Sequence, residues 1–155
     1  MSVDVLQEKI RKTKNPSMVD LALKMSDLPP HLLEEKGSTA AAYGQFCREL
    51  IGGLKGLVPA LRVSFTAFAV LGAEGLNELQ SVLAAASSAG FYVAMEAPFI
   101  LSPMMAEATA EAVWGDNAIY PCDGLIICSY PGSDIIKKFA PYAKEQKKDL
   151  FPVVR

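Results

Sequence analysis

Residues 90–115, "GFYVAMEAPFILSPMMAEATAEAVWG", contain an apolar, β-prone run that leads directly into a helical pattern. Gly90 and Gly115 suit helix C-terminal stops, Ser102 suits a helix N-cap, and Pro103 suits a first helical turn. A nearly all-apolar strand followed by a helix is typical of a parallel sheet whose faces are covered. The stretch therefore predicts one βα unit of an α/β protein.

The same alternation runs along the whole chain. The apolar, β-prone runs that predict strands are residues 17–23, 58–68, 90–97, 123–130 and 149–155. The helical patterns between them cover residues 38–57, 72–89, 102–115 and 132–148, and Ser38 suits the N-cap of the first. This order predicts repeated βαβ units and a parallel sheet of about five units. Periodicity alone does not choose between a sheet covered on both faces and one that closes into a barrel.

Length and charge set broad limits on the class of protein. A chain of 155 residues suits one domain, residues 1–155. Its 15 basic and 17 acidic side chains give a net charge of −2, which makes no electrostatic case for binding nucleic acid or an anionic membrane. The charged N-terminus lacks the apolar core of a signal peptide, and no apolar run has the length of a membrane span. We therefore expect a cytoplasmic protein.

The cysteines and the histidine give no signal for a metal or a cofactor. Cys47, Cys122 and Cys128 lack CxxC spacing, so we expect three buried or half-buried free thiols. His31 is the only histidine and has no cysteine nearby, which argues against a metal site. We therefore expect no metal site.

Five stretches carry a resemblance to a known family. They are "NPSMV" (15–19), "DLPPHLLEE" (27–35), "FCRELIGGLKGLVPALR" (46–62), "GFYV" (90–93) and "DGLIICSYPGSDIIKKFAPYAKEQKKDLFPVVR" (123–155). Together they resemble the bacterial, second-subfamily orotidine 5'-monophosphate decarboxylases of pyrimidine synthesis, over nearly the whole chain. The most specific match places Tyr130, Gly132, Ser133 and Asp134 on the family's Pro-Tyr-x-Gly-x-Asp pattern. The resemblance implies a partial (β/α)8 TIM-type barrel that corresponds to the N-terminal half of those enzymes.

The resemblance also implies where the family's cofactor-free chemistry would lie. In the family, a network of Asp and Lys side chains crowds the substrate carboxylate, and one Lys protonates the carbon that remains. The match places the family's first-strand Asp on Ala22 and its second-strand Lys on Arg62. In the third strand it places the first Asp on Glu96, the proton-donating Lys on Pro98 and the last Asp on Leu101. Proline and leucine exchange no proton, so the match predicts a degenerate catalytic motif.

Two functional hypotheses follow. The first is a decarboxylase-like protein that has lost its activity, a pseudoenzyme, and acts through assembly or through binding a small molecule or nucleotide. The alternative is an enzyme: either an active lyase of UMP biosynthesis completed by a second chain, or a protein with new chemistry at Arg62 and Glu96. The substitutions at Ala22, Pro98 and Leu101 favour the first. The length of the chain also favours the first hypothesis, because the sequence ends on the fifth strand and the family's phosphate-binding Arg lies in a later unit of the barrel.

The candidate ligand site lies at the carboxyl ends of the predicted strands. Neighbouring strands could bring Arg62 and Glu96 together, and we favour an ion pair over a ligand site there. The "SYPGSD" stretch (129–134) leads into a helix, where Gly132 and Ser133 could present N–H groups to an anion. The alternative, which we favour, is a plain turn whose helix is capped by Ser133 or Asp134. Tyr130 belongs to the same candidate site.

A partial barrel should not remain a monomer. Five strands of an eight-stranded barrel leave the first and fifth strands with open edges, and such edges invite association. We also expect apolar side chains on the inner face of the partial barrel to be exposed to water, namely Val63, Phe65, Val93, Met95 and Ile127. A homo-oligomer, most simply a homodimer, would complete or cover the barrel. The other solution is a flattened, doubly wound sheet with helices on both faces.

Overall fold

A single parallel sheet organises the computed structural model, which describes residues 2–154. Its strands are β1 (Met18–Asp20), β2 (Ala60–Ser64), β3 (Tyr92–Glu96), β4 (Gly124–Cys128) and β5 (Asp149–Val153). They lie in the order β1-β2-β3-β4-β5, and every neighbouring pair is parallel. The five parallel strands predicted from the sequence are confirmed, with β1 and β5 at the two edges of the sheet.

One helix precedes the first strand, and the others lie in the connections between strands. They are α1 (Ser2–Thr13), the 3-10 helix η1 (Met25–Asp27), α2 (Pro30–Lys36), α3 (Thr39–Leu54), α4 (Phe65–Ala69), α5 (Gly72–Ser88), α6 (Pro103–Trp114) and α7 (Ser133–Glu145). The predicted N-caps are confirmed, because the side chain of Ser38 accepts a hydrogen bond from the N–H of Ala41 and that of Ser102 accepts one from Met105. No helix within residues 2–154 is long and apolar enough to cross a bilayer.

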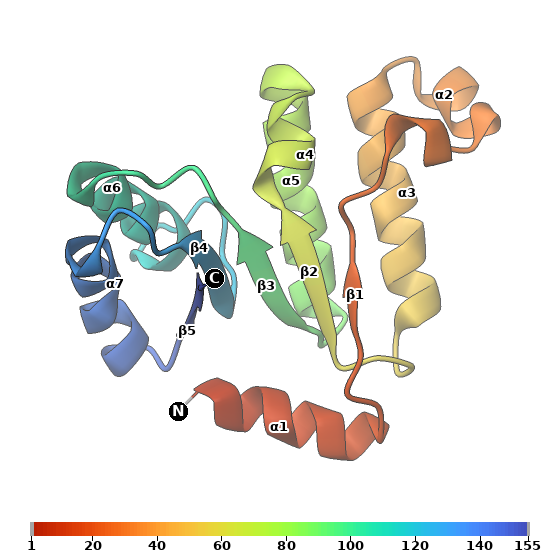
Figure 1. Cartoon of the computed structure of the whole chain (residues 1–155). Helices are drawn as coiled ribbons and strands as arrows, with labels where there is room; N and C mark the ends of the chain where they lie inside the picture. The colour runs from red at the N-terminus through yellow and green to blue at the C-terminus, as the bar shows by residue number, and fades with distance from the viewer. Residues whose placement is uncertain (1, 155) are drawn as a thin grey trace.

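The sheet curves with its connecting helices on one side, as in a partial barrel. Figure 1 shows α3 and α5 flanking β1 and β2, while α6 and α7 flank β4 and β5. One core cluster joins alternate strand residues such as Leu61, Val93 and Leu125 to apolar residues of these helices. The doubly wound arrangement is therefore wrong for this chain, and the expected partial (β/α)8 barrel is the observed fold.

The apolar side chains expected on the inner face of the barrel lie instead on the face of the sheet that packs against the helices. Val63, Val93, Met95 and Ile127 are each at most 1% exposed, since they point toward the helices and form part of the main core. Phe65 is not on a strand, because β2 ends at Ser64 and α4 begins at the next residue. Successive strand residues point to opposite faces, so a shift of one residue exchanges the whole inner and outer sets.

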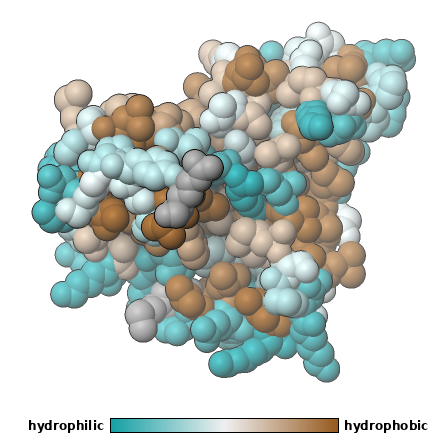
Figure 2. All heavy atoms as spheres, viewed as in Figure 1, coloured by the Kyte–Doolittle hydropathy of each residue, from teal (hydrophilic) through white to brown (hydrophobic). Residues whose placement is uncertain are grey.

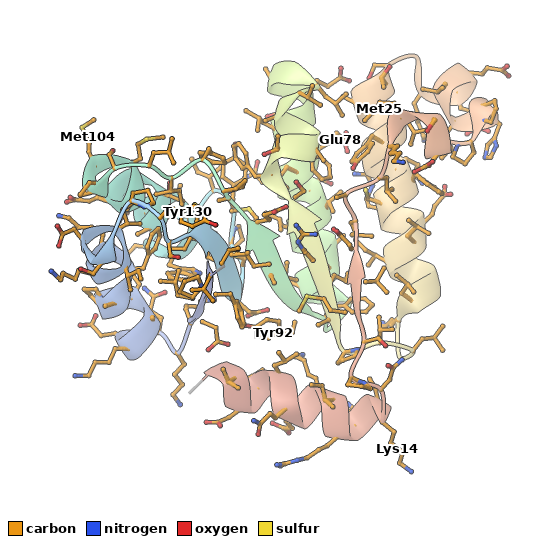
Figure 3. All side chains as sticks on the ribbon, in the orientation of Figure 1. Lys14, Met25, Glu78, Tyr92, Met104 and Tyr130 are labelled. Carbon is orange, nitrogen blue, oxygen red and sulfur yellow. The ribbon has the colours of Figure 1, made fainter. Side chains whose placement is uncertain are left out.

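The inner face carries a smaller apolar cluster at the N-terminal ends of the strands. Ala60, Tyr92 and Ala94 are at most 1% exposed, and three partly buried residues pack against them: Leu6, Ile126 and Phe151. The hydroxyl of Tyr92 donates to the Asp149 carboxylate at 2.6 Å. Figure 3 shows Tyr92 between the sheet and α1. We call these six residues the lower inner cluster.

Helix α1, which the sequence analysis did not predict, closes this end of the sheet. Figure 1 shows it crossing beneath the strands, and Figure 2 shows apolar residues on its side toward the sheet and hydrophilic residues on its far side. The N–H of Val3 donates to Asp149 at 3.1 Å, and the ammonium of Lys9 donates to the carbonyl of Gly90 at 2.6 Å. These two contacts join α1 to segments more than 80 residues away.

The three cysteines are free thiols, as expected. Cys47 and Cys122 are buried and Cys128 is half-buried. Burial raises the pKa of the Cys47 and Cys122 thiols to about 12, because the charged thiolate would lose its hydration. These two thiols therefore stay protonated at neutral pH and serve as small apolar core residues.

Candidate functional site

The candidate site is a three-residue charge cluster on the inner face, at the carboxyl ends of the first three strands. Arg62 on β2 lies between Asp20 on β1 and Glu96 on β3, and we call these three residues the Arg62 cluster. The Nη1 of Arg62 pairs with the Asp20 carboxylate, and its Nη2 pairs with Glu96 at 2.5 Å. The sheet register brings them together, because Asp20 is opposite Arg62 and Glu96 is opposite Ser64, two residues beyond Arg62.

The cluster is half-buried and carries a net negative charge. The exposed side-chain fractions are 32% for Arg62, 42% for Asp20 and 24% for Glu96. Burial acts to lower the pKa of Arg62, but the hydrogen bond that Arg62 donates to Glu96 and the charge of Asp20 outweigh it, so the pKa is raised. One guanidinium between two carboxylates has a formal charge of −1, and the Arg62 group remains protonated at every physiological pH.

The expected pairing of Arg62 with Glu96 is confirmed, but Asp20 was not predicted as a third member of the cluster. The family resemblance directed attention to Ala22, the position that matches the family's Asp. In the structure the backbone N–H of Ala22 donates to the side chain of Asp20 at 3.0 Å, so Ala22 shapes the turn that holds the carboxylate. The available signal was the Asp at the end of the first predicted strand, since the carboxyl ends of parallel strands meet at one edge.

The two remaining positions of the family motif carry no chemistry. Pro98 lies exposed in the turn after β3, and Leu101 is 61% exposed just before α6. Within residues 2–154, no lysine or histidine makes an ion pair or hydrogen bond with the Arg62 cluster. Arginine does not release a proton in proteins, so Arg62 cannot take the role of a proton-donating lysine. The cluster can orient or repel charge.

The loop between β4 and α7 forms a separate feature at the same end of the sheet. Tyr130 is 69% exposed, and Gly132 adopts a φ of 107°, a region that favours glycine. No hydrogen bond or ion pair within the described part of the chain joins this loop to the Arg62 cluster. The two parts of the expected ligand site are therefore not joined by a hydrogen bond or an ion pair within residues 2–154.

The expectation that Ser133 or Asp134 caps α7 is wrong. The N-cap residue is Gly132, and no side chain accepts a capping hydrogen bond there. Ser133 is already the first helical residue, one position too late for its hydroxyl to cap the helix. Asp134 instead pairs with Lys137 at 2.7 Å, and this hydrogen bond lowers the pKa of Asp134. Both side chains are exposed at this helix start.

Metal binding has no support in the described residues. Residues 2–154 contain no group of three His, Cys, Asp or Glu side chains placed to hold an ion. His31 was not expected to bind a metal. It lies exposed in the first turn of α2.

Comparisons with known proteins agree with this fold. No protein-family model matches the sequence. The chain is 30% identical to an orotidine 5'-phosphate decarboxylase of Rhodopirellula baltica over 97% of its own length and 53% of that protein. It therefore spans about half the length of the curated relative that it matches.

Solved structures show the same architecture. An orotidine 5'-monophosphate decarboxylase of Plasmodium berghei superposes with a TM-score of 0.80 at 11% identity, over 98% of this chain and 60% of that one. An OMP decarboxylase of Leishmania donovani gives a TM-score of 0.72 at 22% identity, over 97% and 52% of the two chains. At these identities the likeness shows the fold alone. Given also the 30% identity to the Rhodopirellula baltica protein, the chain is thus similar, in sequence and in fold, to about half of an orotidine 5'-phosphate decarboxylase.

Proposed function

We propose that this chain is an orotidine 5'-phosphate decarboxylase-like protein that has lost the decarboxylation reaction and acts through assembly. The observation that carries the proposal is the Arg62 cluster. Its only cation is held between Asp20 and Glu96, and Pro98 stands where the resemblance places the proton donor. A protein without a proton donor cannot complete a reaction that leaves a carbanion.

The same geometry argues against the Arg62 cluster as the main anion site. An anionic ligand beside Arg62 would meet two carboxylates that already neutralise the guanidinium, for a net charge of −1. Coulomb repulsion in a half-buried site would oppose its binding. A nucleotide at Arg62, Gly132 and Ser133 is therefore the weaker form of the proposal, and assembly is the stronger one.

A patch of exposed apolar side chains supports assembly. Phe99, Leu101, Met104, Met105 and Tyr130 lie on the loops and the first helical turn that follow β3 and β4, and they are 36%, 61%, 79%, 38% and 69% exposed. We call them the rim patch, and Figure 3 shows Met104 and Tyr130 at this end of α6 and α7. Exposed apolar patches of this kind mark protein interfaces, and methionine adapts readily to a partner surface.

The two edge strands of the sheet give a second reason to expect assembly. They differ in how readily each could pair with a further strand. In the described chain, β1 and β5 each pair with one neighbour only. Pro152 lies within β5 and lacks an N–H, which reduces the capacity of that edge to pair with another strand. We therefore expect side-chain contacts of the rim patch, rather than strand addition at β5, to hold a homodimer together.

We expect the purified chain not to decarboxylate orotidine 5'-monophosphate above the uncatalysed rate. The Pro98→Lys variant should not restore turnover, because groups that act as a unit are not replaced singly and Leu101 still lacks a carboxylate. The measurement is loss of orotidine 5'-monophosphate absorbance, with the Rhodopirellula baltica enzyme as the positive control. Turnover that disappears in Arg62→Met would overturn the proposal and favour new chemistry at Arg62 and Glu96.

We expect sedimentation equilibrium at micromolar concentration to give a mass of twice 16.6 kDa. The Leu101→Asp variant should shift the protein to monomer, since a charge placed in an apolar interface must be desolvated. The matched control is Leu57→Asp, because Leu57 has the same exposed fraction of 61% and lies far from the rim patch. A monomeric wild-type chain, or equal effects of the two variants, would contradict assembly through the rim patch.

A further inference from the structure

A hollow of about 490 Å³ lies at the end of the sheet opposite the Arg62 cluster. One wall is a single face of α1, and the other is formed by the loops that lead into β2 and β3. Val5, Val58, Pro59 and Phe91 give it an apolar lining. Its volume falls within the range of about 300 to 1,000 Å³ that is typical of small-molecule sites.

Hydrogen bonds hold the two walls of this hollow, which we call the α1 groove, in fixed positions. The ammonium of Lys9 on α1 donates to the carbonyl of Gly90 on the loop before β3, at 2.6 Å. The side-chain amide of Asn15, just after α1, donates to the carbonyl of Leu57 on the loop before β2, at 2.8 Å. A groove fixed on both sides loses little conformational entropy when a ligand enters.

The charge of the α1 groove is opposite to that of the whole chain. Lys9, Lys12 and Lys55 line it together with one acidic residue, Glu8, although the protein has a net charge of −2. Lys9 is engaged with Gly90, but no ion pair or hydrogen bond within residues 2–154 engages the ammonium groups of Lys12 and Lys55. Two cations are therefore available beside an apolar wall.

We propose that the α1 groove binds a small molecule with an apolar ring and an anionic head group, a phosphate or a carboxylate. The ring lies against Val5, Val58 and Phe91, and the head group is bound by Lys12 and Lys55. Ammonium groups form strong, charge-assisted hydrogen bonds with such anions. The site is independent of the Arg62 cluster, so it stands whether or not the proposed loss of decarboxylation is correct.

The test uses 1-naphthyl phosphate as the probe, with binding measured by calorimetry on the full chain. We expect a dissociation constant below about 1 mM at low salt, which rises with ionic strength because exposed charges are screened. The double variant Lys12→Ala/Lys55→Ala should raise the constant about tenfold, since two charge-assisted contacts are lost. The control Lys36→Ala/Lys144→Ala makes the same change in net charge at exposed positions outside the groove and should leave the constant unchanged.

A second variant tests the apolar wall without a change in charge. Val5 is 41% exposed and lines the groove, so Val5→Trp should fill it and abolish binding while circular dichroism shows a folded protein. Phenyl phosphate and benzoate as further probes distinguish a phosphate head group from a carboxylate one.

Several results would overturn the proposal. If 1-naphthol bound as tightly as 1-naphthyl phosphate, the lysines would not contribute to binding. If inorganic phosphate bound as tightly as 1-naphthyl phosphate, the apolar wall would not contribute. Binding weakened by Arg62→Met but not by Lys12→Ala/Lys55→Ala would place the probe at the Arg62 cluster. The absence of any heat of binding at 5-fold above the expected constant, about 5 mM probe, would remove the site.

Discussion

Replacing Tyr92 by Ala is expected to lower the free energy of unfolding by about 4 kcal/mol. Tyr92 is completely buried at the centre of the lower inner cluster, where Leu6 of α1 packs against it. Removal of the ring leaves a cavity that the surrounding strands cannot close, and large-to-small changes of aromatic core residues cost about 3 to 5 kcal/mol. The Asp149 carboxylate, 8% exposed, also loses a donor at 2.6 Å.

The control Tyr92→Phe separates the ring from the hydroxyl. It keeps the packing and removes one buried hydrogen bond, so we expect a loss of about 1 to 2 kcal/mol. Urea unfolding at a fixed protein concentration measures both variants. Trypsin should also cut Tyr92→Ala faster than wild type at Lys9, Arg11 and Lys12 of α1, because the helix loses its packing partner. Equal losses in the two variants would show that the ring does not support α1.

Replacing Gly75 by Ala is expected to lower the free energy of unfolding by about 2 to 3 kcal/mol, although alanine is the better helix former. Gly75 lies in the first turn of α5, close against the preceding short helix α4. An added Cβ would lie closer than 3.0 Å to the backbone carbonyl oxygen of Phe68 and 2.6 Å from the Cβ of Leu71. The gain in helix propensity, about 1 kcal/mol, is smaller than the cost of moving this corner of the backbone.

The matched control is the same substitution in an open place. Gly52 lies inside α3 with no atom within 4 Å of an added Cβ, so Gly52→Ala should raise the free energy of unfolding by about 0.5 to 1 kcal/mol. For a chain of this length each kcal/mol moves the melting temperature by about 2 to 4 °C, so opposite shifts are easily measured. If both variants raised the melting temperature, the backbone between α4 and α5 would be able to move enough to accommodate a methyl group at position 75.

The Arg62 cluster shows how the inner face of this fold accommodates three charged side chains. Arg62 keeps a positive charge on β2, but its planar guanidinium engages two carboxylates at once, which a single ammonium does less well. Asp20 and Glu96 approach from both neighbouring strands, so the three side chains join β1, β2 and β3 at their carboxyl ends.

Much of the fold was present in the local sequence. Apolar runs of strand length that alternate with helical patterns predicted five parallel strands, and Ser38, Ser102 and Pro103 marked helix starts because their chemistry acts within one turn. The quoted motifs also carried the relationship to the decarboxylase family. Short-range rules suffice for these features, since hydrogen-bonded turns and side-chain periodicity depend on neighbours in the chain.

The face that each strand residue occupies, and the side chains that it meets, depend on the packing of the whole chain. Val63, Val93, Met95 and Ile127 were expected inside the barrel and lie outside it, because an apolar strand covered on both faces gives no polar alternation to fix its phase. Asp20 joined Arg62 through the register of β1 on β2, and register is a property of two strands rather than of one segment. Helix α1 packs beneath the sheet through hydrogen bonds to residues that are 81 and 146 positions away in the sequence. A pattern of neighbouring residues cannot predict contacts over such separations.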